Sequence, residues 1–376
     1  MIVRVGPIAL VLGLLAGFVS AETVQRRGGG EPITAVEIEV RPEGLYVVRA
    51  NGTPQIVPWD MVQSIEEIQD PVALKAWELK QPMAEDLWRA RTRLQRGDGR
   101  LAEPLFEAYF ENLRSDGADS ELSLIVAEGL LRSRLSAGEI EAAIPSALET
   151  IRLRRAGVTT DRYLGLPEVL DERIWLVPTL PPVPTDRAAL LALPESLAPW
   201  IQDEDKYIAA LARAYSSMSR ESKVAEVKSG NSGVQVVQTA IDTLADDAKV
   251  RTAAIRTLNS LAEQPDAPDF VSAWKHWFNA RSMMLEEDVD LDIALIELLH
   301  IPAIYRRDQP ALAARAVACA ADTLQTAGRD AEAALLQREL FVSQADVRPA
   351  LALETEQPTT QQYESESDED DLSENQ

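Results

Sequence analysis

Two stretches of eleven residues, LQRGDGRLAEP (residues 94–104) and LSAGEIEAAIP (residues 135–145), decide how most of this chain folds. A glycine at the fourth position can end a helix in the left-handed conformation, and an alanine five residues later lets a second helix pack closely on the first. The pattern therefore predicts antiparallel helical hairpins. The repeated residues are Leu94, Gly97, Ala102 and Pro104, which recur as Leu135, Gly138, Ala143 and Pro145.

The helical pattern continues from about residue 73 to residue 345, with apolar side chains three and four positions apart. Residues 206–227 show it well, because Tyr207, Leu211, Tyr215 and Met218 share one face. Four prolines between residues 178 and 184 cannot enter a helix. We therefore expect two helical lobes, at 70–177 and 186–347, joined by an extended linker at 178–185.

The hairpin pattern resembles tetratricopeptide-type repeats, in which a large apolar residue stands nine positions after the glycine. Gly97, Ala102 and Phe106 fit all three positions, whereas the other two units fit the first two. The resemblance implies an antiparallel helix-hairpin α-solenoid that binds peptides or proteins without catalysis. The partly fitting units are Gly138, Ala143 and Ala147, and Gly328, Ala333 and Gln337.

The first 21 residues have the features of a signal peptide. One basic residue, Arg4, precedes an apolar run from Ile8 to Val19, and small residues follow at Ser20 and Ala21. The apolar run is shorter than the roughly 20 residues that span a bilayer. We expect cleavage between Ala21 and Glu22 and export to the periplasm or beyond; an uncleaved anchor is the alternative. A flexible, glycine-rich linker is expected at 22–32.

Residues 33–69 change to the period of two that is typical of strands. Three short strands are expected, with a type I′ turn at Asn51-Gly52. Asp60 is expected to cap the helix that follows. The turn spacing resembles part of an SH3-like small barrel. The expected fold is therefore mainly α, with a small N-terminal three-stranded β unit.

Few residues suit catalysis or metal binding. The chain has two histidines, His276 and His300, neither with metal-ligand spacing, and one cysteine, Cys319, in an apolar helix. One cysteine cannot form an intramolecular disulfide. The run from Asp288 to Asp292 imitates the start of an EF-hand, but the positions that need Gly and Glu hold Ile293 and Leu299. We expect no cofactor, no metal and no assignable catalytic residue.

One aromatic cluster stands out, at Trp274, Trp277 and Phe278. It is the candidate interaction site, because such a stripe can line a groove for a partner. The alternative is a core seam between helices, since apolar stripes on helices usually face inward. Trp175 and Trp200 carry the same two interpretations.

The negative charge of the chain bears on the class of partner that it can bind. The net charge of −24 argues against nucleic acid, which requires a basic surface. The acidic segment 348–376 is expected to be disordered. It either keeps the protein soluble or attracts a basic partner electrostatically. The resulting hypothesis is an exported, non-catalytic scaffold for protein–protein interaction. The alternatives are a carbohydrate-active enzyme with an α/α fold and a self-associating structural module.

Overall fold

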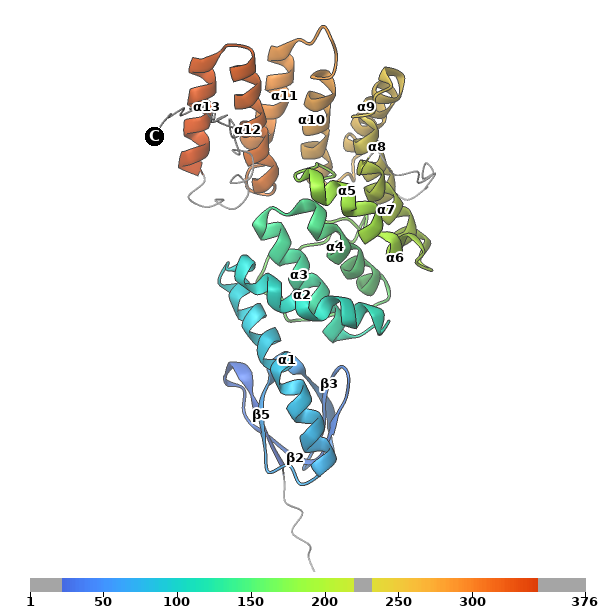
Figure 1. The fold of residues 1–376 in the computed structure, drawn as a ribbon, viewed down its shortest axis with the longest axis vertical. Helices are drawn as coiled ribbons and strands as arrows, with labels where there is room; N and C mark the ends of the chain where they lie inside the picture. The colour runs from blue at the N-terminus through green and yellow to red at the C-terminus, as the bar shows by residue number, and fades with distance from the viewer. Residues whose placement is uncertain (1–21, 220–231, 344–376) are drawn as a thin grey trace, which may run out of the picture.

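The computed structural model describes residues 22–219 and 232–343. The described chain begins with a five-stranded antiparallel sheet in the order β4-β3-β2-β1-β5. Figure 1 shows this sheet at one end of the molecule and the last helices at the other. The strands are β1 (Glu22–Arg26), β2 (Ile33–Val40), β3 (Gly44–Arg49), β4 (Pro54–Pro58) and β5 (Val62–Glu66).

Two of these strands correct the three-strand prediction. Residues 22–26 were expected in a flexible linker, but they form β1, which pairs with both β2 and β5. Its single apolar residue, Val24, is fully buried and lies opposite Ile33 and Ile65. A five-residue strand with one apolar side chain has almost no period of its own, so long-range pairing determines its structure.

The turns of the sheet also differ from expectation. The β3–β4 hairpin is present and Gly52 has the positive φ of 82°, but Asn51 does not, so the turn is not type I′. Asp60 does not cap a long helix. It lies in a single 3-10 turn, η2 (Trp59–Met61), that leads directly into β5.

Helix α1 (Pro71–Gln95) connects the sheet to the helices. Asp70 is its N-cap, accepting a hydrogen bond from the amide of Val72 at 2.9 Å. The first half packs on the sheet, where Trp77 stacks on Trp59 with 6.1 Å between ring centroids. The second half packs on α2 (Gly99–Ser115) and α3 (Glu121–Ala137), so one continuous helix belongs to both regions.

The predicted hairpin features are confirmed. Gly97, Gly138 and Gly328 all have positive φ, at 83°, 79° and 73°, and each separates two helices that pack together. The alanines at the fifth position, Ala102, Ala143 and Ala333, are buried. The helix pairs are α1–α2, α3–α4 (Ile140–Arg155), and α12 (Pro310–Thr326) with α13 (Asp330–Ser343).

The proline-rich segment has no helix or strand, as expected of an extended linker, but much of it is buried. Leu180, Pro181, Pro182 and Val183 are buried. The Leu180 carbonyl accepts a hydrogen bond from the Tyr215 hydroxyl at 3.1 Å. The segment lacks regular structure because of its prolines, yet it forms part of the core between the helices on either side.

The remaining helices follow one another in space as they do in sequence, each packing on the next from α8 to α13. Figure 1 shows α10 to α13 side by side at the end opposite the sheet. Among the described residues, no helix is long and apolar enough to cross a membrane. The elements are α5 (Arg187–Ser196), α6 (Ala198–Ile201), α7 (Lys206–Ser216), η3 (Ser217–Ser219), α8 (Ser232–Asp242), α9 (Ala248–Ala262), α10 (Asp269–Met283) and α11 (Leu291–Ile304).

Three predictions fall outside the described residues: the signal peptide at 1–21, the acidic segment at 348–376, and the end of the helix expected at 206–227. The described part of that helix agrees with the prediction as far as Ser216, and η3 follows it.

Candidate interaction surface

The aromatic cluster predicted as an interaction site lies in the core. Trp274 and Phe278 on α10 have no exposed surface, and Trp277 is 6% exposed. Trp274 packs edge-on against Phe270 at 5.2 Å and donates from its indole nitrogen to the Pro178 carbonyl at 3.2 Å. Burial removes all three side chains from any surface that a partner could contact, which agrees with the alternative interpretation as a core seam.

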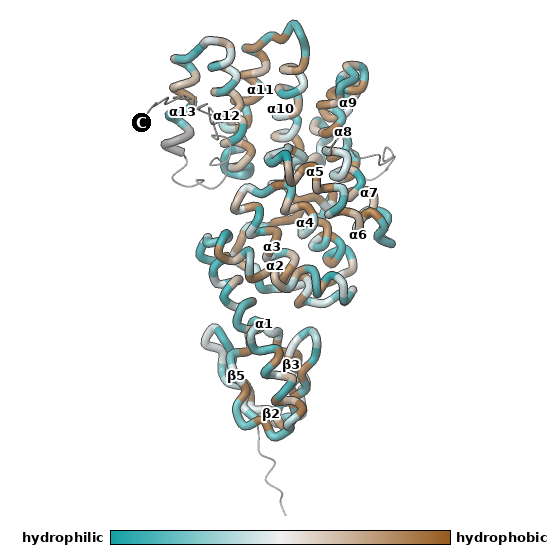
Figure 2. Tube along the Cα trace, in the orientation of Figure 1, coloured by the Kyte–Doolittle hydropathy of each residue, from teal (hydrophilic) through white to brown (hydrophobic). Residues whose placement is uncertain are grey.

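The neighbouring helix α11 presents apolar residues outward instead. Its inner face buries Leu295, Leu298 and Ile301. Its outer face carries Ile293, Ile296 and Ile304, which are 48%, 65% and 61% exposed. Figure 2 shows how apolar α11 is along its length. A helix that is apolar on both sides normally has neighbours on both sides, so the outer face is a candidate binding surface.

His300 completes this outer face, because positions 293, 296, 300 and 304 fall on one side of an α-helix. We call Ile293, Ile296, His300 and Ile304 the α11 stripe. It extends from residue 293 to residue 304, eleven steps along the helix, or roughly 16 Å at 1.5 Å per residue.

His300 of the α11 stripe contacts the other histidine of the chain. The rings of His276, on α10, and His300 stack with 4.2 Å between centroids. His276 Nδ1 is 2.7 Å from Glu297 Oε2, and the Tyr305 ring lies 6.2 Å from His276. The sequence did not predict this contact, because the two histidines are 24 positions apart and only the packing of adjacent helices brings them together. Among the residues that the structure describes, no group of three or more potential ligands could hold a metal ion.

The two ends of the α11 stripe differ in charge. The turn before α11 holds Glu286, Glu287, Asp288 and Asp290, and Asp290 caps the helix by accepting from the Ile293 amide at 3.3 Å. This confirms that the EF-hand imitation is an acidic helix start. After the helix come Arg306 and Arg307, both exposed.

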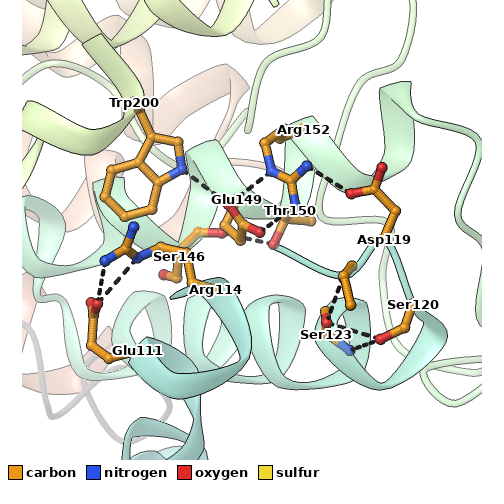
Figure 3. Close-up of polar contacts among 11 residues, drawn as sticks. Glu111, Arg114, Asp119, Ser120, Ser123, Ser146, Glu149, Thr150, Arg152 and Trp200 are labelled. Carbon is orange, nitrogen blue, oxygen red and sulfur yellow. Dashed lines mark hydrogen bonds and ion pairs between the residues drawn. The ribbon is translucent and has the colours of Figure 1, made fainter. Parts of the chain in front are cut away.

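Trp200 is buried in a polar junction between three helices (Figure 3). Its indole nitrogen donates to Glu149 of α4 at 3.1 Å, and Arg152 donates to the same carboxylate at 2.8 and 3.1 Å. On α2, Phe110 stacks on the indole at 6.4 Å and the Arg114 guanidinium lies 5.1 Å from its centroid. With its charge matched and three donors in place, Glu149 here serves to join α4 to α6.

Trp175 is half-buried and has a positive φ of 55°, which is unusual for a bulky residue. Its turn is held by Tyr207, whose hydroxyl donates to the carbonyls of Ile174 at 2.7 Å and Trp175 at 2.9 Å. The Arg155 guanidinium lies 5.3 Å from the Trp175 ring and 4.7 Å from that of Tyr207. The turn at Trp175 is therefore stabilised by contacts with Tyr207 and Arg155 of the same chain.

Cys319 lies in the middle of α12, as predicted, and is half-buried. The Arg281 guanidinium donates to its sulfur at 3.4 Å.

Comparisons of the chain with protein-family models, with curated proteins and with solved structures find no match. The candidate surface therefore rests on the geometry of this chain alone.

Proposed function

We propose that this protein is an exported scaffold that binds another protein through the α11 stripe, without catalysis. The observation that carries the proposal is the exposure of three isoleucines on one helix face whose opposite face is fully packed. Exposed apolar side chains gathered on one face commonly mark interaction sites, whereas scattered ones need no explanation.

We also propose that the helices form a tetratricopeptide-like α-solenoid, and their arrangement supports this. Three glycines in left-handed conformation are each followed by a buried alanine, and Phe106 at the large position is fully buried. The last unit differs from the repeat pattern at this position, because it has Gln337 in place of a large apolar residue, and Gln337 is exposed. Consecutive helices that pack in order build extended surfaces, and α-solenoids use such surfaces, on their concave side, to bind partners.

We also propose that the N-terminal sheet is related to the SH3-like small barrels that its turn spacing resembles. Beyond the turn spacing, the sheet has five antiparallel strands, with β1 between β2 and β5 and a 3-10 turn between β4 and β5. Its inner face is covered by α1, so in this chain the sheet is attached to the helices rather than independent.

Export is proposed from the first 21 residues, and the geometry of β1 is compatible with cleavage. Glu22 is the first residue of β1 and is buried, with its carboxylate accepting from the Gln69 amide at 3.0 Å. Cleavage between Ala21 and Glu22 would leave every strand of the sheet on the mature chain. Mass spectrometry of the secreted protein should find Glu22 at the amino terminus; an intact Met1 would contradict the signal peptide.

The binding proposal is tested with a photo-crosslinking amino acid at position 296 of the mature chain. A matched chain carries it at Leu79, which is 75% exposed but lies on α1, far from α11 in sequence. Crosslinks in envelope extracts should form from position 296 and not from position 79. A third chain, ending after residue 353, keeps the stripe but loses the acidic end. Crosslinks that need this end, or that form equally from position 79, would overturn the assignment.

A further inference from the structure

The α11 stripe has unlike charges at its two ends and an apolar middle. Acidic residues at 286, 287, 288 and 290 precede the first isoleucine, whereas Arg306 and Arg307, followed by Asp308, come after the last, so this end keeps one net positive charge. Some of these charges already have partners: Arg251 lies 2.6 Å from Glu286, and Arg306 lies 3.8 Å from Glu339. Both Arg306 and Glu339 remain more than half exposed, so their ion pair is weak and easily exchanged.

Such a stripe is complementary to itself when reversed. If two α11 helices lie antiparallel about a two-fold axis near Leu298, Ile293 of one copy comes level with Ile304 of the other. The arginine end of each copy then lies beside the acidic turn of its partner. A two-fold contact satisfies both ends at once, because each surface meets the same surface of the other copy.

We propose that the α11 stripe pairs with the α11 stripe of a second copy of this chain, in antiparallel orientation. The inference rests on the proposed function and names the partner. In this pairing His300 of each copy comes level with Glu297 of the other, whose carboxylate also lies 2.7 Å from His276 of its own copy. A parallel pairing would instead place acidic turn against acidic turn.

The size of the stripe sets the strength of the contact. Stable interfaces bury about 800 Å² on each partner, more than four side chains supply. The net charge of −24 also repels a second copy at low ionic strength, although salt near 0.15 M screens charges more than about 8 Å apart. We therefore expect a dimer that dissociates on dilution.

Sedimentation equilibrium of residues 22–376 near 0.15 M salt tests the pairing. The chain should show a monomer–dimer equilibrium, and Ile296→Asp should weaken dimerisation by about tenfold or more, because it puts a charge in the centre of the contact. Leu79→Asp, at a leucine on α1 that is 75% exposed against 65% for Ile296, should leave dimerisation unchanged. Circular dichroism confirms that both variants keep their helical content. A monomer at every concentration would overturn the inference, as would equal effects of the two variants.

Charge exchange tests the antiparallel orientation. One chain carries Arg306→Glu and Arg307→Glu, so that both ends of its stripe are acidic. Another carries Glu287→Arg and Asp288→Arg, so that two arginines offset Glu286 and Asp290 and the turn loses its net negative charge. Each alone should dimerise about tenfold more weakly than wild type, and an equimolar mixture should recover a heterodimer. A mixture that associates no better than its components would contradict the pairing.

The two proposals fail in different ways. If the wild-type chain is monomeric but position 296 still crosslinks specifically to another protein, the binding surface stands and the second copy is wrong. If Ile296→Asp does not weaken self-association and crosslinks form equally from positions 296 and 79, both proposals are wrong.

Discussion

Arg91 Nε lies 2.9 Å from Asp60 Oδ2, and this ion pair joins the sheet to the second half of α1. Asp60 has 1% of its side chain exposed, and Arg162, from the segment after α4, approaches its other oxygen at 3.7 Å. Burial raises the pKa of the Asp60 carboxyl above its ordinary value, although the Arg91 and Arg162 guanidiniums act to lower it. One carboxylate thus connects three parts of the chain that are distant in sequence.

Asp60→Ala should lower the free energy of unfolding by about 3 kcal/mol, because it leaves the largely buried Arg91 guanidinium without its carboxylate, whereas Arg162 keeps Asp161 at 3.2 Å. Equilibrium unfolding in urea measures the change. Glu85→Ala is the matched control: Glu85 pairs with Arg89 on the surface of α1, and exposed pairs contribute about 0–1 kcal/mol. Equal losses in the two variants would show that Asp60 does not connect the regions.

The parts of the fold that were predictable depend on local signals. Gly97, Gly138 and Gly328 mark helix ends because a left-handed residue suits glycine, and this preference needs no tertiary contact. Asp290 was recognisable as a helix start for a similar reason, since a carboxylate one residue before a helix can accept from its free amides.

The parts that were missed depend on distant partners. β1 has too few apolar residues to show a period, and β2 and β5 supply its pairing. The proline-rich segment has the sequence of a linker because prolines exclude helix, but the burial of this segment and the hydrogen bonds that its carbonyls accept from Tyr215 and Trp274 could not be predicted. The same limit applies to the candidate surface. Exposed and buried isoleucines are identical residues, so only the packing of α11 shows which face is free.

Gly233→Ala should destabilise the protein by about 2–4 kcal/mol, because a Cβ atom there would lie 2.1 Å from the Ile174 carbonyl oxygen and 2.4 Å from the Tyr207 hydroxyl. The backbone of the segment after α4 would have to move away from α8. Thermal unfolding of Ser232→Ala, the exposed neighbouring residue in the same helix, gives the control and should differ from wild type by less than about 0.5 kcal/mol. An unchanged stability of Gly233→Ala would contradict the close packing of this segment on α8.

Trp200→Phe should cost about 1–3 kcal/mol, since it keeps an aromatic ring beside Phe110 but removes the donor to buried Glu149. The contribution of the hydrogen bond is separated by a double-mutant cycle with Glu149→Leu, which removes the acceptor, measured by urea unfolding. Coupling of about 1 kcal/mol or more is expected for a buried charged acceptor. Additive effects would mean that packing alone holds α6 on α4.

Tyr109 should ionise at a higher pH than an ordinary tyrosine. Burial, the hydrogen bond to Asp86 Oδ2 at 2.8 Å and the charge of Asp86 together raise the pKa of Tyr109 to about 12. Because the pKa in the folded state is higher than in the unfolded chain, the stability that Tyr109 contributes is complete below about pH 10 and is lost as the pH rises through its folded value. Asp86→Asn should lower the pKa of Tyr109, since the amide carries no negative charge to oppose the phenolate. Ultraviolet absorbance titrations follow the change, with Tyr109→Phe identifying the contribution of this residue among the seven tyrosines. A Tyr109 that ionises at its ordinary pH, with or without Asp86, would show that the hydrogen bond between α1 and α2 does not form in solution.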